Sequence, residues 1–206
     1  MKWYNALPFI FHKKSFLVEN EFITSLSTLL PTIEPKYRSL TLRTKVVLKM
    51  SSLIILFSYH HKNTEKVAQV IAKTLDAEIK KPEQTDPNSL TNYDLLGFGS
   101  GIYFRHHHKV LLQFVDKIPQ AANKKAFIFS TSGQTGNMQK FHKQLKEKLL
   151  AKGFNIVSEF NCAAFDTFGL LKIVGGLNKE RPNEDDLEKA KEFALSLKKN
   201  MPDATK

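Results

Sequence analysis

The chain has few of the residues from which small proteins build cross-links or membrane segments. Its 206 residues include one cysteine. An intramolecular disulfide and a cysteine-based metal cluster are therefore excluded, and a reducing compartment is favoured. No apolar stretch reaches the roughly 18 residues that a membrane-spanning helix needs. We expect a globular protein of the cytoplasm that has no membrane span.

The charge of the chain is strongly one-sided. Lysine and arginine outnumber the acidic residues, which gives a formal net charge of +11. Such a field favours polyanions, acidic protein partners or anionic ligands, and it says nothing about the fold. A solvated lysine-rich surface explains it better than a nucleic-acid patch, because no zinc-finger spacing or RNA-binding aromatic motif is present. We expect no nucleic-acid partner.

Residues 1–49 differ in composition from the rest of the chain. Aromatic and basic side chains are mixed there, and three prolines interrupt any long helix. The apolar stretch ending at Phe11 is short and lacks the small-residue cleavage site of a secretory signal. We expect a poorly ordered basic and aromatic extension; a membrane-surface segment is the alternative. Met50 directly precedes a strand pattern, which also suggests a later start of the functional chain.

From residue 50 onward, short apolar runs alternate with amphipathic stretches. Strand patterns cover residues 53–57, 77–80, 94–99, 126–129 and 154–157, and helical patterns cover 64–75, 110–118, 138–151 and 187–197. Strands that alternate with helices predict an α/β fold with a parallel sheet and helices on both of its faces. We expect one domain over residues 50–200 and a tail at 201–206.

A polar segment follows the first strand, at the point where a helix begins. In an open parallel sheet, ligands bind beyond the carboxyl ends of the strands. The segment is Ser58-Tyr59-His60-His61-Lys62-Asn63-Thr64. Its donors lie where free backbone N–H groups and the helix dipole already favour an anion. A simple helix cap by Asn63 is the alternative interpretation.

Two further segments follow the third and fourth strands. In Gly97-Phe98-Gly99-Ser100-Gly101-Ile102-Tyr103-Phe104, three glycines allow close backbone approach and Tyr103 offers an aromatic face. A turn whose tyrosine packs on the next helix is the alternative there. Hydroxyls of Ser130-Thr131-Ser132-Gly133 suit hydrogen bonds to a polar ligand. Ser132 lacks the Gly-x-Ser-x-Gly elbow of hydrolases and has no Asp and His partners in place.

Three adjacent histidines, 106–108, look like a metal tract. Successive side chains at a helix start diverge by roughly 100°, so they cannot all reach one ion. We expect a solvated helix start there and no metal site. Cys162 is expected to be a small buried apolar side chain without a redox role.

The pattern Ser-x-His-x-x-Asn-Thr-x-Lys-Val-Ala from residue 58 resembles the phosphate loop of a flavodoxin subfamily. The segments at 97–104, 130–136 and 162–169 resemble the same family in the same order. The resemblance implies a three-layer flavodoxin-like fold, with a five-stranded parallel sheet of order 2-1-3-4-5, and flavin mononucleotide (FMN) as cofactor. Phe165 and Phe168 are expected to plug the end of the sheet.

The resemblance also implies which residues contact FMN. The phosphate would lie against Ser58, His60, Lys62, Asn63 and Thr64; Lys62 stands where the family usually has glycine, and it adds positive charge. The isoalloxazine ring would contact Ser100, Gly101, Ile102 and Tyr103. The ribityl chain and pyrimidine edge would contact Ser130, Thr131, Ser132 and Gly133. No residue is expected to act as a separate acid or base.

The function implied is that of a one-electron carrier between protein partners, a reductase and an acceptor. Most flavodoxins are acidic, so the basic charge of this chain departs from the family and favours acidic partners. An FMN-dependent NAD(P)H or quinone oxidoreductase is the alternative, with nicotinamide stacked directly on FMN because no Gly-x-Gly-x-x-Gly is present. A flavin-free module that binds another anion is a second alternative. The pattern does not indicate an oligomeric state.

Overall fold

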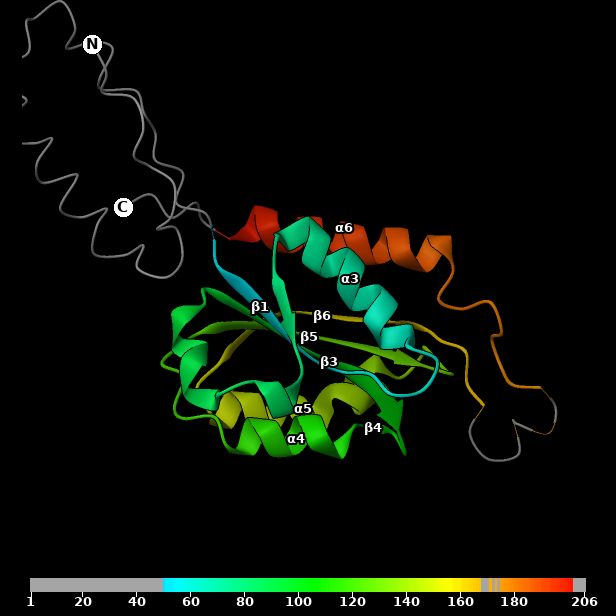
Figure 1. Cartoon of the computed structure of the whole chain (residues 1–206), viewed down its shortest axis with the longest axis horizontal. Coiled ribbons are helices and arrows are strands. Elements are labelled where there is room, and N and C mark those ends of the chain that lie inside the picture. The colour runs from blue at the N-terminus through cyan, green and yellow to red at the C-terminus, as the bar shows by residue number, and fades with distance from the viewer. Residues whose placement is uncertain (1–49, 168–170, 172, 174, 202–206) are drawn as a thin grey trace, which may run out of the picture. The chain divides into compact units, whose positions relative to one another are not determined.

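Apolar runs and amphipathic helices alternate along the chain and build a sheet between two helical layers (Figure 1). The computed structural model describes residues 50–167, 171, 173 and 175–201. The expected extension at 1–49, Phe168 and all but the first residue of the expected tail lie outside the described residues. No helix within the described ranges combines the length and apolar character that crossing a membrane requires.

Six strands form the sheet. They are β1 (Ser52–Phe57), β2 (Glu78–Lys80), β3 (Leu95–Tyr103), β4 (His106–His107), β5 (Lys125–Ser132) and β6 (Asn155–Ala163). The helices are α3 (Asn63–Leu75), α4 (Lys109–Asp116), α5 (Met138–Ala151) and α6 (Glu184–Asn200), with short 3-10 helices η3 (Pro82–Gln84) and η4 (Pro87–Asn92).

The strand order is β2-β1-β3-β5-β6, and every pair on this path is parallel. These are the five strands expected from the sequence, in the expected 2-1-3-4-5 order, so the predicted fold class is confirmed. The short strand β4 is additional, and it pairs antiparallel with the end of β3.

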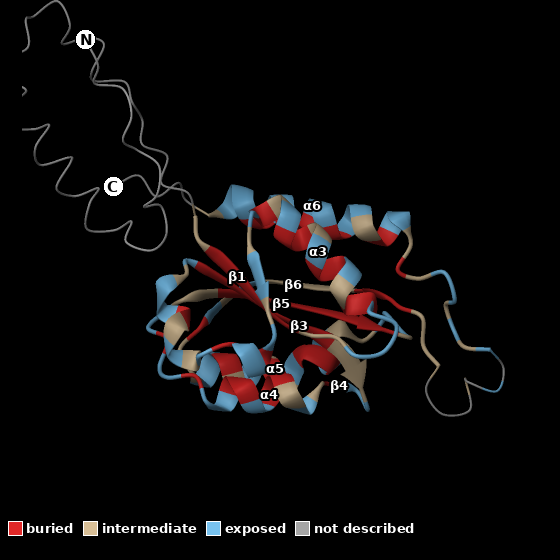
Figure 2. Ribbon diagram, in the orientation of Figure 1, coloured by how far each residue is buried: buried red, intermediate tan, exposed pale blue. Residues whose placement is uncertain are grey.

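Helices α3 and α6 cover one face of the sheet, and α4 and α5 cover the other (Figure 1). Because successive strand side chains point to opposite faces, the strands feed two cores. In β1, Leu53 and Ile55 pack in the core beneath α4 and α5, whereas Ile54 and Leu56 pack in the core beneath α3 and α6. The central strands β1, β3 and β5 are therefore buried on both sides, and each helix buries only its inner face (Figure 2).

The glycines of β3 serve packing against β5. A Cβ at Gly97 would lie 2.4 Å from the Phe127 ring, and one at Gly99 would lie 2.1 Å from the Phe129 ring. Both rings lie in the core beneath α3 and α6. From the sequence, this strand is expected to end at Gly99 and to lead into a loop, but β3 extends four residues further. The strand continues to Tyr103 because the glycines make room for neighbouring aromatic rings.

Candidate functional site

A cavity of about 460 Å³ opens at the carboxyl ends of the parallel strands. This volume lies within the usual range of about 300–1,000 Å³ for ligand pockets. Four chain segments line the cavity, at the carboxyl ends of β1, β3, β5 and β6, and α5 adds Phe141. The position is the one at which open α/β sheets bind ligands, because their loops converge there.

Ten of the thirteen residues expected to contact FMN line this cavity. They are Ser58, His60, Asn63, Thr64, Gly101, Ile102, Tyr103, Thr131, Ser132 and Gly133. The structure thus brings three segments together that are far apart in the sequence. Lys62, Ser100 and Ser130 do not line the cavity.

The segment after β1 turns sharply into α3. His61 and Lys62 both have a φ of 53°, a left-handed conformation that favours glycine. Lys62 is the N-cap of α3, and its side chain makes no cap hydrogen bond. That side chain is 74% exposed and lies 3.9 Å from the Glu65 carboxylate, which places it outside the cavity. The first turn of α3 therefore keeps backbone N–H groups that no cap side chain satisfies.

Asn63 and Thr64 join this turn to the other loops. Asn63 is the first residue of α3, so the alternative interpretation as its cap was wrong. Its Nδ2 donates to the backbone oxygen of Phe165 at 2.8 Å, and the Thr64 hydroxyl lies 2.8 Å from the Thr131 hydroxyl. Both side chains are buried. They hold the segments after β1, β5 and β6 in a fixed arrangement around the cavity.

The segment after β3 is a hairpin, β3–β4, with Phe104 and Arg105 at its tip. Both residues have positive φ, 49° and 70°, which is a strained conformation for side chains of this size. Phe104 is 78% exposed, and both residues line the mouth of the cavity. The tip therefore presents an aromatic ring and a cation beside the candidate ligand site.

The histidine tract forms part of this hairpin, so the expectation of a solvated helix start was wrong. His106 and His107 form β4, and alternation along a strand turns His107 inward, where it is 2% exposed. His108 caps α4, and its ring stacks on Phe57 with centroids 3.9 Å apart. Within the described ranges, no group of three or more His, Cys, Asp and Glu side chains could hold a metal ion.

Ser100 and Ser130 are partners across β3 and β5, and neither is exposed. The Ser100 hydroxyl lies 2.9 Å from His107 Nδ1, and the Ser130 hydroxyl lies 2.7 Å from His142 Nε2. Both serines point beneath the floor of the cavity, toward the face covered by α4 and α5. They support the neighbouring residues that do line the cavity.

The segment after β6 supplies lining residues that the expected contacts left out: Ala164, Phe165, Asp166, Thr167, Leu171 and Leu177. The Phe165 ring lies 4.4 Å from the His61 ring, centroid to centroid. The available signal was the resemblance of the segment 162–169, which contains Phe165-Asp166-Thr167, to flavodoxins, but a single sequence does not show that this segment lies against the first loop. Also left out were Tyr59, His61, Phe104, Arg105, Gln134 and Phe141.

The chemistry of the lining is aromatic and weakly cationic. Burial raises the pKa of the Tyr103 phenol despite an opposing hydrogen bond from the His60 backbone, so the phenol stays neutral. Arg105 and the exposed His60 and His61 lie on the rim. Cys162 is buried, as expected, and this burial raises the pKa of its thiol to about 12.

Comparison with known proteins fits this geometry. The family profile described as "Flavodoxin domain" matches residues 54–164, which is more than half of the chain. An uncharacterized protein of Methanocaldococcus jannaschii is 54% identical over 151 residues, which are 73% of this chain and 100% of that relative. The chain belongs to the flavodoxin family.

Solved flavodoxins share the fold at lower identity. Oxidised Flavodoxin 2 from Bacillus cereus is 21% identical, with a TM-score of 0.56 over 73% of this chain and 99% of that one. A flavodoxin from the domain Archaea is 15% identical, with a TM-score of 0.53 over 73% and 97%. The predicted family is therefore confirmed, and the cavity of this flavodoxin-family protein lies in a fold consistent with flavin binding.

Proposed function

We propose that this protein binds FMN in the cavity at the carboxyl ends of β1, β3 and β5, and carries electrons one at a time between protein partners. The observation that carries the proposal is the uncapped first turn of α3, which opens beside an aromatic-lined cavity. A helix N-terminus favours a phosphate through its free N–H groups and its dipole. The cavity volume of about 460 Å³ lies within the usual range for ligand pockets of about 300–1,000 Å³.

The residues present fit this cofactor. Backbone N–H groups at the start of α3, with Ser58 and His60, would hold the phosphate. Gly101, Ile102 and Tyr103 would lie against the ring; a Cβ at Gly101 would meet the Tyr103 ring at 3.1 Å, so the backbone there has little room for a side chain. The segment Thr131–Gly133 would donate and accept hydrogen bonds along the ribityl chain and the pyrimidine edge. When bound, FMN would supply the redox chemistry, and the protein would supply binding and orientation.

The proposal extends to acidic partners that dock at the mouth of the cavity. Arg105 lies there together with the exposed rings of Tyr59 (72%) and Phe104 (78%), and Lys62 is exposed on the turn that leads into α3. A partner could pack against the exposed rings while its carboxylates pair with Arg105 and Lys62, so a partner surface rich in carboxylates fits this region. The single buried cysteine fits a reducing compartment, and we place this electron transfer in the cytoplasm.

A direct oxidoreductase is the second candidate, and the two exposed rings favour it. Tyr59 and Phe104 both line the mouth, where a nicotinamide or quinone ring could stack without a second nucleotide-binding domain. Rapid bleaching of the flavin spectrum by NADH or NADPH alone would select this candidate. Bleaching only in the presence of a reductase protein would select the carrier.

The visible spectrum of the purified protein tests the cofactor, and titration with FMN and riboflavin tests the phosphate site. We expect FMN to bind at least tenfold more tightly than riboflavin, a difference of about 1.4 kcal/mol. The double variant Asn63→Ala with Thr64→Val is expected to weaken FMN binding, because it releases the turn that carries the phosphate site. Equal affinities for both flavins, or an unchanged FMN affinity in the double variant, would reject the proposal.

A further inference from the structure

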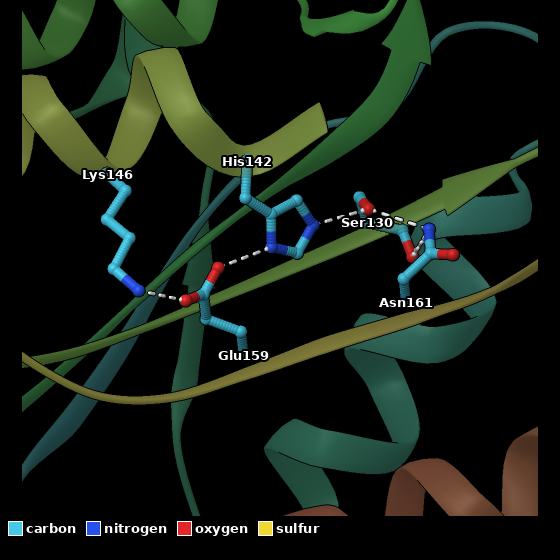
Figure 3. A network of polar contacts seen from close by, with 5 residues as sticks. All are labelled: Ser130, His142, Lys146, Glu159 and Asn161. Carbon is cyan, nitrogen blue, oxygen red and sulfur yellow. Dashed lines mark hydrogen bonds and ion pairs between the residues drawn. The ribbon is translucent and has the colours of Figure 1, made fainter. Parts of the chain in front are cut away.

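A chain of polar side chains, partly exposed at Lys146 and fully buried at its centre, connects α5 to the floor of the cavity (Figure 3). Lys146 Nζ lies 2.5 Å from Glu159 Oε1, and Glu159 Oε2 lies 3.0 Å from His142 Nδ1. His142 Nε2 lies 2.7 Å from the Ser130 hydroxyl, which lies 2.9 Å from Asn161 Nδ2. His142 and Ser130 have no exposed surface. The proposed binding of FMN leaves these side chains without an assigned role.

For a neutral His142, the chemistry of the groups sets the direction of each hydrogen bond between Asn161 and Glu159. The amide nitrogen of Asn161 can only donate, so the Ser130 oxygen accepts from it. The Ser130 O–H is then free to donate to His142 Nε2. An imidazole that accepts at Nε2 carries its proton on Nδ1, which donates to the Glu159 carboxylate. His142 is thus held as one neutral tautomer.

The chain continues from Asn161 into the cavity. Asn161 Nδ2 also lies 3.1 Å from the Ser132 hydroxyl oxygen, which accepts from it. The Ser132 O–H donates in turn to the backbone oxygen of Gln134. Ser132 and Gln134 both line the cavity. The protonation state of His142 can therefore change the hydrogen bonds of Ser132 and of the Gln134 carbonyl at the candidate ligand site.

Protonation of His142 would reverse this direction. With protons on both ring nitrogens, His142 donates to the Ser130 oxygen, and the Ser130 O–H needs another acceptor. Asn161 Oδ1 can be that acceptor, because it is buried and has no hydrogen-bond partner among the described residues. Once the amide has turned over, Oδ1 can also accept from Ser132. The Gln134 carbonyl and the Ser132 oxygen are then both free to accept from a ligand N–H group.

We propose that His142 is a positioning residue of the flavin site, which acts through Ser130 and Asn161 on the orientation of the Ser132 hydroxyl. The inference rests on the proposed function. The charged and titratable groups that face His142 are Glu159 from β6, Lys146 from α5 and His107 from β4, whose ring lies 5.0 Å away. Burial lowers the pKa of His142 and outweighs the opposing hydrogen bond and charge of Glu159.

The first experiment follows the ring nitrogens of the ligand-free full chain by ¹⁵N NMR during an acid titration. We expect the Nδ1–H tautomer of His142 at neutral pH, and we expect the backbone amides of Ser132 and Gly133 to shift with the titration of His142. In Asn161→Ala the His142 titration remains, but these amides no longer follow it. A His142 with its proton on Nε2, or amides that follow it equally well in Asn161→Ala, would overturn the inference.

The second experiment measures riboflavin affinity between pH 5 and pH 8. Riboflavin is the probe because it lacks the FMN phosphate, which itself titrates near pH 6. We expect riboflavin to bind about threefold to tenfold more tightly as His142 becomes protonated. By linkage, riboflavin then raises the pKa of His142. Ser130→Ala interrupts the chain without changing the charge, so its riboflavin affinity loses this pH dependence.

Ser100→Ala is the matched control, because it removes the buried hydroxyl of the cross-strand partner and leaves the His142 chain intact. It is expected to keep the pH dependence of wild type. The same pH dependence in Ser130→Ala and wild type would show that His142 has only a structural role. If neither flavin binds to any variant, the proposed function fails, and the ligand-free titration alone decides whether His142 controls Ser132.

Discussion

Adjacent residues of β5 meet opposite environments on the two faces of the sheet. Thr131 faces α3, where its hydroxyl pairs with that of Thr64 in a contact that carries no charge. Ser130 faces α5, where its hydroxyl pairs with His142 in a network that ends on Glu159. The first face fixes the loops with groups that do not titrate. The second face supports the same cavity with groups whose charge depends on pH.

The comparison extends into the two cores. Beneath α3 and α6, Phe127 and Phe129 press against the glycines of β3. On the face covered by α4 and α5, Ser100 and Ser130 are cross-strand partners near the cavity; the Ser100 hydroxyl hydrogen-bonds His107, and the Ser130 hydroxyl hydrogen-bonds His142. Tight apolar packing and a buried polar network thus lie back to back. Each should respond differently to substitution and to pH.

The largest effect is expected from Gly99→Val on the tightly packed face. The added side chain would collide with the Phe129 ring, which lies in a fully buried core. Overpacking of this kind costs about 1–3 kcal/mol or more, and we expect about 3 kcal/mol loss in the free energy of unfolding by urea denaturation. Gly136→Ala is the control, because nothing lies within 4 Å of its added Cβ. Equal costs for the two variants would contradict this account of the β3 glycines.

His142→Leu tests the polar face. It leaves the Ser130 hydroxyl and the Glu159 carboxylate short of a partner, and we expect a loss of about 1–3 kcal/mol in unfolding free energy at pH 8. Burial lowers the pKa of His142, and it lowers that of His107 to well below 6.5. A histidine of this kind adds stability that is present above its unfolded pKa and is lost as pH falls toward its folded pKa.

Wild type should therefore lose stability below about pH 6.5, the unfolded value of histidine. The variant lacks one of the two buried imidazoles, so its unfolding free energy should fall less steeply, and its deficit should shrink between pH 8 and pH 5. Urea denaturation at both pH values measures this. Parallel losses for the variant and wild type would show that His142 does not contribute to the acid sensitivity.

A double-mutant cycle of Thr64→Val and Thr131→Val tests the uncharged face. The two hydroxyls are 2.8 Å apart and buried, so we expect a coupling free energy of about 1 kcal/mol. Neither group titrates, and the coupling should be equal at pH 5 and pH 8. A coupling that changes with pH would remove the distinction between the two faces.

The smallest effect on stability, within about 0.5 kcal/mol, is expected for Arg105→Glu at the exposed hairpin tip. If acidic partners dock at the cavity mouth, the substitution should slow association with an acidic redox protein about tenfold at low salt. Lys189→Glu makes the same charge change on α6, and Lys189 is exposed and does not line the cavity. Stopped-flow kinetics measures the association rate of both variants. Equal slowing of the two would show that only the net charge of the protein matters, and not the position of Arg105.

The strongly periodic elements were predictable from the sequence. The run Leu53–Phe57 and the spacing of Val67, Ile71 and Leu75 identified a buried strand followed by a helix, because burial on both faces of a strand or on one face of a helix leaves a direct pattern. The polar loops were located as the segments that follow these strands. The resemblance to flavodoxins then implied which of their residues contact the cofactor, and ten of those residues line one cavity.

The segment from residue 97 to 108 was not predictable in the same way. The strand was expected to end at Gly99, because the aromatic rings that fill the space beside Gly97 and Gly99 come from residues some thirty positions later. The inward turn of His107 depends on the pairing of β4 with β3. The local sequence pattern carries no information about the β5 rings beside the glycines or about the pairing of β4 with β3.

The sequence by itself determined the order of strands and helices and the polar character of the loops, since these depend on residues close together in the chain. Only the tertiary structure decided which of two adjacent hydroxyls, at Ser130 and Thr131, would meet a histidine and which would meet a threonine. That choice depends on which helix covers which face of the sheet, and helix docking is set by packing between residues that are distant in the chain.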